Sequence, residues 1–255
     1  MGSILDIQSG CLGIRAYDTR VEMGERAAKD AAGRLNTIIQ EKGMANAVFA
    51  AAPSQNEFLA SLLQQNVDWT RVRAFHMDEY IGLEEDAPQG FGNFLKEAIF
   101  DIVDFGAIYY LNGQAPDPMA ECERYAGLLA KYPPDIVFLG IGENGHLAFN
   151  DPGVADFDDP QRVKVVELDD ICRNQQVNDG CFERLGDVPK QALTLTMSAL
   201  MDIRDAIVVV PGQTKRDAVT RTVKGPITTD CPASVLQRHK NAVLYLDRES
   251  AAGLL

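Results

Sequence analysis

The chain has 255 residues and carries 24 lysines and arginines against 37 aspartates and glutamates, which gives a net charge of −13. Hydrophobic residues make up 46% of the sequence, enough apolar material for a large core, so a disordered or fibrous chain is excluded. An acidic chain repels phosphate backbones and anionic lipid surfaces, and we expect neither nucleic-acid nor membrane binding. A small anion is still an acceptable ligand, because a few local groups can override the overall field. No apolar run approaches the roughly 20 residues of a membrane span.

The five cysteines are few, odd in number and widely spaced. A disulfide framework or a zinc site needs paired or closely spaced cysteines, so neither is expected. Reduced thiols are typical of a cytosolic protein, and the N-terminal residues lack the basic flank and apolar core of a signal peptide. The sequence therefore predicts a cytoplasmic protein. The cysteines are Cys11, Cys122, Cys172, Cys181 and Cys231.

Short apolar runs alternate with longer amphipathic stretches along the chain. The first helix is expected to begin near Asp18 and Thr19 and to end at Gly43, and one strand is expected before it. Further strands are expected at 47–52, 72–75, 108–111, 135–139, 163–168, 192–196, 206–210 and 242–246. Further helices are expected at 57–65, 91–100, 118–132, 171–178, 215–224 and around 234–239.

This alternation predicts an α/β fold with a doubly wound, mostly parallel sheet and helices on both faces, in a single Rossmann-like domain over residues 1–255. In such sheets a ligand binds beyond the carboxyl ends of the strands. Three segments with polar or glycine residues follow predicted strands in this way, at 76–80, 140–153 and 211–215. We expect the functional residues in these segments.

The glycine-rich segment 140–145 has the sequence GIGENG, which fits the GxGxxG pattern of dinucleotide-binding proteins. That pattern needs a helix to follow at once, whereas Pro152 and Gly153 come within eight residues, and the segment lies in the middle of the chain. We instead expect a loop whose backbone approaches a ligand closely at Gly142 and Gly145. No dinucleotide cofactor is expected.

His146 follows this loop and precedes Asp151 by five residues. A lone histidine is usually structural, but an imidazole oriented by a carboxylate suits proton transfer near neutral pH. We therefore interpret His146 as functional.

The acidic pair Asp78 and Glu79 comes just after a short predicted strand. These residues are either solvated loop acids or partly buried groups with a raised pKa, and the second environment suits abstraction of a proton from carbon. A metal site that combines them with His76 and His146 has no recognised ligand spacing, so we expect no metal.

Lys215 follows a strand and a turn and opens a helix. The N–H groups at a helix start together with a lysine form a plausible anion site. A solvated lysine at a helix start is the alternative, and this segment alone leaves both open.

Taken together, these segments resemble the glucosamine-6-phosphate deaminase/isomerase family. The resemblance runs in the family's order from about residue 45 onward. It is carried by FHMDEYIGL at 75–83, LGIGENGHLAFNDPG at 139–153, LNG at 111–113 with AEC at 120–122 and Tyr125, VPKQALT at 188–194 and PASVL at 232–236.

The resemblance implies an aldose–ketose isomerisation coupled to loss of ammonia from an amino sugar phosphate, with no external cofactor. Asp78 matches the aspartate that moves a proton between C2 and C1. His146 matches the histidine that assists ring opening, and Asp151 matches the acid that supports it, which is often a glutamate. Many members carry an aspartate at Asn144, which can hydrogen-bond the imidazole but holds no charge. Lys215 matches the phosphate lysine.

The chain departs from the family after the strand at 47–52. Members carry a Thr-Gly-Gly-Thr-Pro loop there that binds the sugar phosphate, whereas residues 50–56 of this chain read AAAPSQN. Pro53 removes one N–H, and Ser54 and Gln55 offer other donors, so both are expected to bind substrate together with Glu79. The family's phosphate arginine is also missing, since its place falls at Asn178, with Arg173 nearby. Phosphate recognition is therefore altered.

Two other functions stay open at this point. Sugar-phosphate lactonases resemble the chain in the glycine loop and its histidine, but they usually carry Asp-Glu-Arg where this chain has Asp78, Glu79 and Tyr80. A non-catalytic sugar-phosphate-binding module is the third possibility, although Asp78 and His146 are both retained. Assembly into a homo-oligomer is left open by the sequence.

Overall fold

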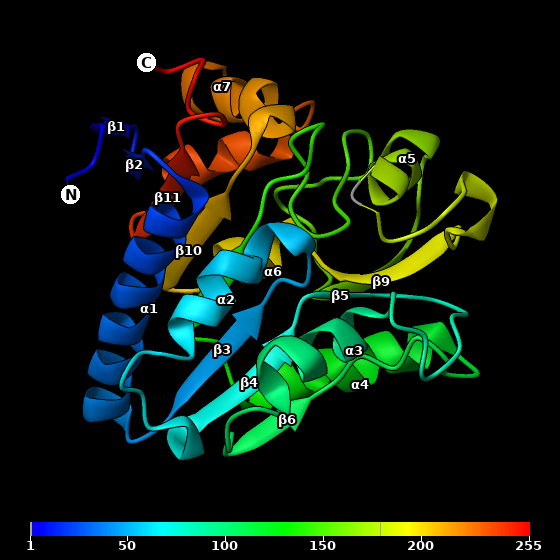
Figure 1. Ribbon diagram of the computed structural model, residues 1–255. Helices are drawn as coiled ribbons and strands as arrows, with labels where there is room; N and C mark the ends of the chain where they lie inside the picture. The colour runs from blue at the N-terminus through cyan, green and yellow to red at the C-terminus, as the bar shows by residue number, and fades with distance from the viewer. Residues whose placement is uncertain (1, 179) are drawn as a thin grey trace.

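A computed structural model describes residues 2–178 and 180–255 of the chain (Figure 1). Its main sheet has eight strands in the order β1-β2-β11-β10-β7-β3-β4-β6. All neighbouring pairs are parallel except β1 and β2, which form an antiparallel hairpin at one edge. The strands are β1 (Leu5–Ser9), β2 (Leu12–Tyr17), β3 (Ala45–Phe49), β4 (Val72–His76), β6 (Ala107–Tyr109), β7 (Ile136–Leu139), β10 (Asp205–Val210) and β11 (Ala242–Asp247).

A second, smaller sheet is antiparallel throughout and was not predicted. It has the order β5-β9-β8, with β5 at Asp78–Tyr80, β8 at Val163–Glu167 and β9 at Gln191–Leu195. The two strands expected at 163–168 and 192–196 are therefore real, but their assignment to the parallel sheet is wrong. The prediction of one strand before residue 45 is also wrong, because Gly10, with a φ of 57°, turns β1 back into β2.

The helices are α1 (Arg20–Lys42), α2 (Asn56–Leu62), α3 (Phe91–Leu95), α4 (Pro118–Lys131), α5 (Asp170–Asn178), α6 (Met197–Met201) and α7 (Arg216–Lys224). The expected helices are present in order, except that the one around 234–239 is a 3₁₀ segment, and α6 was not predicted. The short 3₁₀ segments are Pro53–Gln55, Trp69–Arg71, Leu185–Asp187, Gln213–Lys215 and Pro232–Arg238, and one π turn at Lys96–Phe100 continues α3.

The first helix, α1, begins and ends where its sequence predicts. Thr19 caps the start by accepting a hydrogen bond from the Glu22 N–H, and Gly43 ends the helix with a φ of 81°. Ala27, Ala31 and the later apolar residues at the same spacing are fully buried against the sheet.

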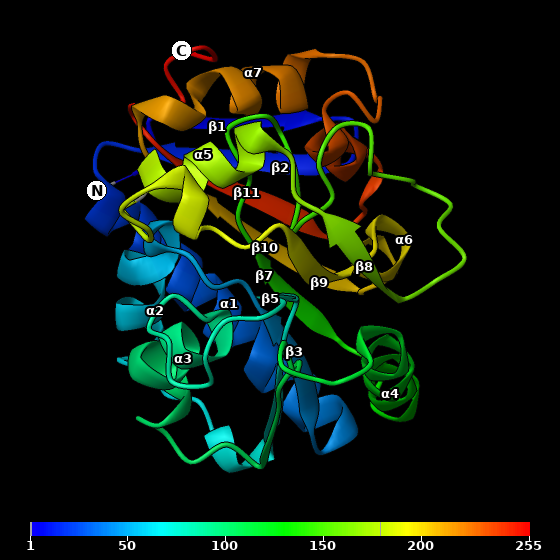
Figure 2. The same ribbon diagram turned by 90° about the vertical axis from the view of Figure 1, so that its right-hand side faces the viewer.

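Helices cover both faces of the main sheet, which confirms the predicted fold class. Figure 2 shows the sheet between α1, α2 and α3 on one side and α4 and α6 on the other. Strand β7 illustrates the two layers: Ile136 and Phe138 pack in the core under α1 and α2, whereas Val137 and Leu139 pack in the core under α4 and α7. A strand buried on both faces reads as a continuous apolar run, as this one does.

The described part of the chain contains no helix that combines the length and apolar character of a membrane span. All five cysteines lie within the described residues, and each is a free thiol.

Candidate active site

The chain leaves the carboxyl ends of the neighbouring strands β3 and β7 in opposite directions along the sheet. After β3 the chain continues to β4 on one side, while β10, the next main-sheet strand after β7, lies on the other side. Such a switch point is where ligands bind in open α/β sheets. In Figure 1 the arrows of β3, β4 and β10 point toward this end of the sheet, above which α5 lies.

A cavity opens at this switch point, and the three segments expected to carry function all reach it. Predicted residues in its wall are Ser54, Asp78, Gly142, His146 and Lys215. The remaining lining residues are Ala50, Ala51, Ala52, Met77, Phe91, Gly140, Ile141, Ala148, Phe149, Gln175 and Gln176.

Asp78 and Glu79 point in opposite directions because both lie on strand β5, where successive side chains alternate. Asp78 enters the cavity, whereas Glu79 accepts hydrogen bonds from the backbone N–H groups of Tyr80, Phe91 and Gly92 at 2.8–3.0 Å. The expected substrate contact of Glu79 is therefore corrected: both of its oxygens hold the start of α3.

Burial is the main electrostatic influence on both acids. It raises the pKa of the Asp78 carboxyl well above its ordinary value, and the neighbouring Glu79 raises it further. Burial also raises the pKa of Glu79, although its three backbone N–H contacts oppose the effect. Asp78 therefore has the environment of a carboxyl group that holds its proton more tightly than an exposed acid does.

His146 and Asp151 form the acid-oriented imidazole that the sequence predicts. The His146 Nδ1 atom lies 2.8 Å from Asp151 Oδ1, and both side chains are buried. This contact orients the imidazole ring, which lines the cavity. Burial opposes ionisation of Asp151, but the contacts with His146 and Asn144 outweigh it and hold its pKa below the ordinary value.

Asn144 supports this pair and does not line the cavity. Its Nδ2 donates to Asp151 Oδ1 at 2.8 Å, and its Oδ1 accepts from the backbone N–H of His146 at 3.0 Å. The side chain thus fixes the carboxylate and the loop together. This is the contact of a positioning residue, in place of the catalytic role assigned from sequence.

At two positions of the loop, neighbouring atoms lie so close to the backbone that a side chain would not fit and glycine is required. A Cβ at Gly142 would lie 2.2 Å from the His146 ring, so the imidazole packs directly on the Gly142 backbone. Gly145 has a φ of 94°, and its Cβ would lie 2.7 Å from Cys231 Sγ. Gly142 lines the cavity, whereas Gly145 shapes the turn behind it, so the expected ligand contact of Gly145 is not formed.

Strand β9 contacts both Asp78 and the loop that carries His146, and so fixes their relative positions. Thr194 of β9 pairs with Asp78, and its hydroxyl accepts a hydrogen bond from the Phe149 N–H at 3.1 Å. Asn150 is fully buried and donates to the carbonyls of Leu147 and Leu195. Sequence reasoning missed these anchors, because they depend on the second sheet.

His76 is a structural histidine. Its Nδ1 lies 2.9 Å from the carbonyl of Asp78, and its Nε2 accepts from the Leu111 N–H at 3.0 Å, so both ring nitrogens are used in the neutral form. A metal site that combines His76 with Asp78, Glu79 and His146 is therefore not formed.

The buried His76 predicts an acid-sensitive contribution to stability. Burial lowers its pKa from 6.5 to about 4, so the unfolded state binds the extra proton between these values. The contribution is full above pH 6.5 and is lost as the pH falls to about 4, at a cost of roughly 3 kcal/mol. In urea unfolding, the stability gap between wild type and His76→Gln should shrink by that amount from pH 7 to pH 4. A gap that stays constant across this range would contradict the assignment.

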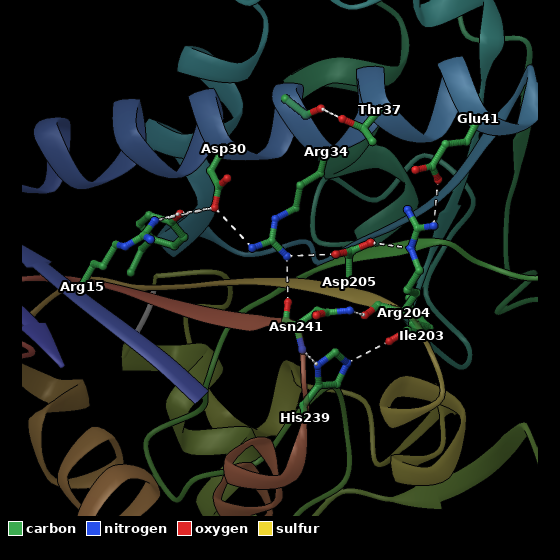
Figure 3. A network of polar contacts seen from close by, with 12 residues as sticks. Arg15, Asp30, Arg34, Thr37, Glu41, Ile203, Arg204, Asp205, His239 and Asn241 are labelled. Atoms are coloured by element: carbon green, nitrogen blue, oxygen red, sulfur yellow. Dashed lines mark hydrogen bonds and ion pairs between the residues drawn. The ribbon is translucent and has the colours of Figure 1, made fainter. Parts of the chain in front are cut away.

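The third histidine, His239, lies at the opposite end of the sheet in a polar network (Figure 3). Its Nε2 lies 2.8 Å from the Ile203 carbonyl, and burial lowers its pKa. The same network joins Arg34 to Asp205 and to the Asn241 carbonyl. These contacts connect α1 to the amino ends of β10 and β11, away from the cavity. Of the three histidines, all within the described residues, His146 is the one that lines the cavity.

The polar groups around the rest of the cavity differ from those expected. Gln55 is buried but does not line the cavity, because its Nε2 donates to the Val209 carbonyl at 3.1 Å. Arg173 points away and donates to the carbonyls of Leu185 and Val188. Helix α5 instead presents Gln175 and Gln176 to the cavity, and Asn178 is not among the lining residues.

The open space of the cavity is about 70 Å³. This volume is smaller than the roughly 300–1,000 Å³ of typical ligand pockets. Gln175 and Gln176 of α5 form part of the wall that limits this space.

One group of described residues could share a metal ion. The donor atoms of His146, Asp151 and Cys172 lie within 4.8 Å of one another, and all three residues are buried. Burial and the nearby Asp151 raise the pKa of the Cys172 thiol, which disfavours the thiolate that a metal ligand requires. The contacts of this group suit an oriented imidazole better than a metal centre.

Comparison with known proteins places this geometry in a family. The family model described as "Glucosamine-6-phosphate isomerases/6-phosphogluconolactonase" matches residues 18–245. A protein of Streptococcus suis named glucosamine-6-phosphate deaminase is 39% identical over 206 residues, 81% of this chain and 86% of its own length. A protein of Bacillus cytotoxicus with the same name is 35% identical over 230 residues, 90% of this chain and 86% of its own length.

Solved structures agree with these matches. A structure described as a monomeric glucosamine-6-phosphate deaminase superposes with a TM-score of 0.85 at 30% identity, covering 94% of this chain and 98% of that one. A 6-phosphogluconolactonase from Trypanosoma brucei gives a TM-score of 0.80 at 18% identity, covering 98% of this chain and 100% of that one, and shows the shared fold. The chain belongs to the glucosamine-6-phosphate isomerase/6-phosphogluconolactonase family.

Proposed function

We propose that the protein isomerises and deaminates a hexosamine phosphate, releasing ammonia and a ketose phosphate. The observation that carries the proposal is the single cavity that holds a buried carboxyl group with a raised pKa, Asp78, together with the His146–Asp151 pair. Relatives that are 35–39% identical over most of the chain are named glucosamine-6-phosphate deaminases. The 6-phosphogluconolactonase of known structure compared above is 18% identical and shows the shared fold.

The reaction is built from proton transfers between the sugar and these side chains. His146 moves a proton at the ring oxygen and opens the sugar to its aldehyde form. The Asp78 carboxylate then takes the proton from C2 while water supplies a proton to O1, which gives an enolamine, and Asp78 returns its proton to C1. The resulting imine at C2 adds water and expels ammonia, leaving the C2 ketone. Asp151 stabilises the charged imidazole during these steps.

The groups of this chain and water are sufficient for each step, so we propose a reaction without a metal or an organic cofactor. Ser54, Gly142 and Lys215 line the cavity and are proposed to contact the sugar phosphate. Gln175 and Gln176 also line the cavity, and we propose that they contact the substrate too. Asn144 is proposed to act only through Asp151 and the backbone of His146.

The assay that tests this function measures ammonia and ketose together. Purified protein incubated with glucosamine 6-phosphate should release both in a 1:1 ratio, and galactosamine 6-phosphate tests the epimer. A lactone of a sugar phosphate, such as 6-phosphogluconolactone, is assayed alongside. Hydrolysis of the lactone without ammonia release would favour the lactonase, and tight sugar binding without turnover would favour a binding module.

We also propose that the protein acts in the cytoplasm, and the five free thiols support a reducing compartment. The number of subunits is tested by light scattering. The similar solved deaminase is described as monomeric, and a homo-oligomer is the alternative outcome.

A further inference from the structure

We propose that this cavity binds free hexosamine within about 10³-fold of the phosphorylated sugar, because Lys215 is the one lysine or arginine among its described lining residues. This inference deepens the proposed function and rests on it for the identity of the ligand as a hexosamine.

The cavity offers little positive charge. The titratable groups that face it are Asp78, His146 and Lys215, and among the described lining residues Lys215 is the one lysine or arginine. Arg173, on the adjacent helix, is committed to backbone carbonyls and to Asp170. A dianion in this cavity therefore meets one side-chain cation and a neighbouring carboxyl group.

Part of the backbone of the loop after β3 is used within the protein. Ala50 donates its N–H to the Phe138 carbonyl at 3.0 Å, Gln55 donates its N–H to the Ala52 carbonyl at 2.9 Å, and Pro53 has no N–H. The 3₁₀ turn Pro53–Gln55 continues directly into α2. The wall facing a ligand at this point is made of alanine methyl groups and the Ser54 hydroxyl.

The side-chain amide of Gln55 is buried behind the cavity wall. Gln55 is 1% exposed, and its Nε2 is fixed by the Val209 carbonyl, which defines the orientation of the amide. Its Oε1 is buried and has no hydrogen-bond partner among the described residues. The amide packs against Gly140, which lines the cavity. The Gln55 amide therefore belongs to the protein interior behind the cavity wall and is not among the groups that line the cavity.

Gln175 and Gln176 complete this lining from α5. Their neutral amides give a phosphate no ion pair, and the Gln175 Oε1 already accepts a hydrogen bond from the Glu143 N–H at 2.9 Å. One charge-assisted contact, from Lys215, is worth a preference of about 10- to 150-fold for the phosphorylated sugar. A site built from several cations would reach far higher values.

The experiment measures binding without turnover. Calorimetry on the Asp78→Asn protein, which retains the cavity but not the proposed base, gives the dissociation constants of glucosamine and glucosamine 6-phosphate. We expect the two constants to differ by less than about 10³-fold. In the same background, Gln176→Arg should raise the preference for the phosphate by about 10- to 150-fold, and the matched Gln176→Glu should lower it.

The outcomes separate this inference from the proposed function. A preference for the phosphate above 10³-fold overturns the inference and leaves the deaminase proposal intact. Binding of both sugars within that range, with no ammonia released by the wild-type protein, supports the inference and overturns the deaminase proposal. Absence of binding for either sugar overturns both. An unchanged preference in both Gln176 variants also contradicts the inference, because it would show that α5 does not contact the bound ligand.

Discussion

Replacing Asp78 with asparagine is expected to lower the rate of ammonia release by about 10²- to 10⁴-fold and to stabilise the folded protein at neutral pH. The loss of rate follows because an amide cannot take the C2 proton. The gain in stability follows from the raised pKa of Asp78, since burial penalises the carboxylate in the folded state alone. The contribution of Asp78 to stability is present below its unfolded pKa and is lost as the pH rises through the folded one.

The stability gap between Asp78→Asn and wild type should therefore grow as the pH rises from about 4. Urea unfolding across this range, together with the ammonia assay, measures both effects. Asp135→Asn is the matched control: Asp135 is equally buried, pairs with Lys42 and accepts from the Asn46 N–H at the amino end of β7. It should lose stability and keep its activity. A destabilised Asp78→Asn protein, or one with wild-type activity, contradicts the assignment.

Gly142→Ala should disable the site without removing any functional group. The added Cβ would lie 2.2 Å from the imidazole of His146, so the ring has to leave its place beside Asp151. A displacement of this size costs about 10²-fold in rate in an oriented site. Steady-state kinetics of ammonia release measure the loss, which we expect mainly in kcat.

Gly33→Ala is the matched control for this substitution. Gly33 lies in α1 with nothing within 4 Å of its Cβ position, so the alanine should stabilise the helix by about 1 kcal/mol and leave the kinetics unchanged. Full activity in Gly142→Ala would mean that the position of the His146 ring on the Gly142 backbone is not required.

The main sheet and the first helix were predictable because their signals are local. Thr19 and Gly43 mark the ends of α1 in the sequence, and apolar residues at helical spacing mark its buried face. The continuous apolar run of β7 likewise indicates a strand covered on both sides. The rule that ligands bind beyond strand ends then brings three distant segments to one cavity.

The second sheet was not predictable, because membership of a sheet depends on distant partners. The runs at β8 and β9 read as strands, yet nothing local distinguishes an antiparallel pair from members of the parallel sheet. Strand β5 is three residues long and begins with two acids, so it lacks an apolar pattern. Its pairing with β9 is what sends Asp78 into the cavity and Glu79 away from it. The opposite roles of these neighbours follow from that register.

The residues of α5 that line the cavity were also not predictable from the sequence. The helix was predicted, but which of its residues face the cavity depends on its rotation about its own axis. The resemblance places the family's missing arginine at Asn178, with Arg173 nearby, whereas the structure presents Gln175 and Gln176 to the cavity. The helix is polar on most sides, so the sequence contains no strong apolar stripe to fix that rotation.

The central claim is that Asp78 moves a proton from C2 to C1, and a substrate deuterated at C2 tests it most directly. The hexosamine 6-phosphate is turned over by the wild-type protein, and NMR locates the deuterium in the product. We predict that deuterium leaves C2 and appears at C1 of the ketose or in the solvent, and that Asp78→Asn stops the transfer. Ammonia release with the deuterium retained at C2 of an aldose product would contradict it.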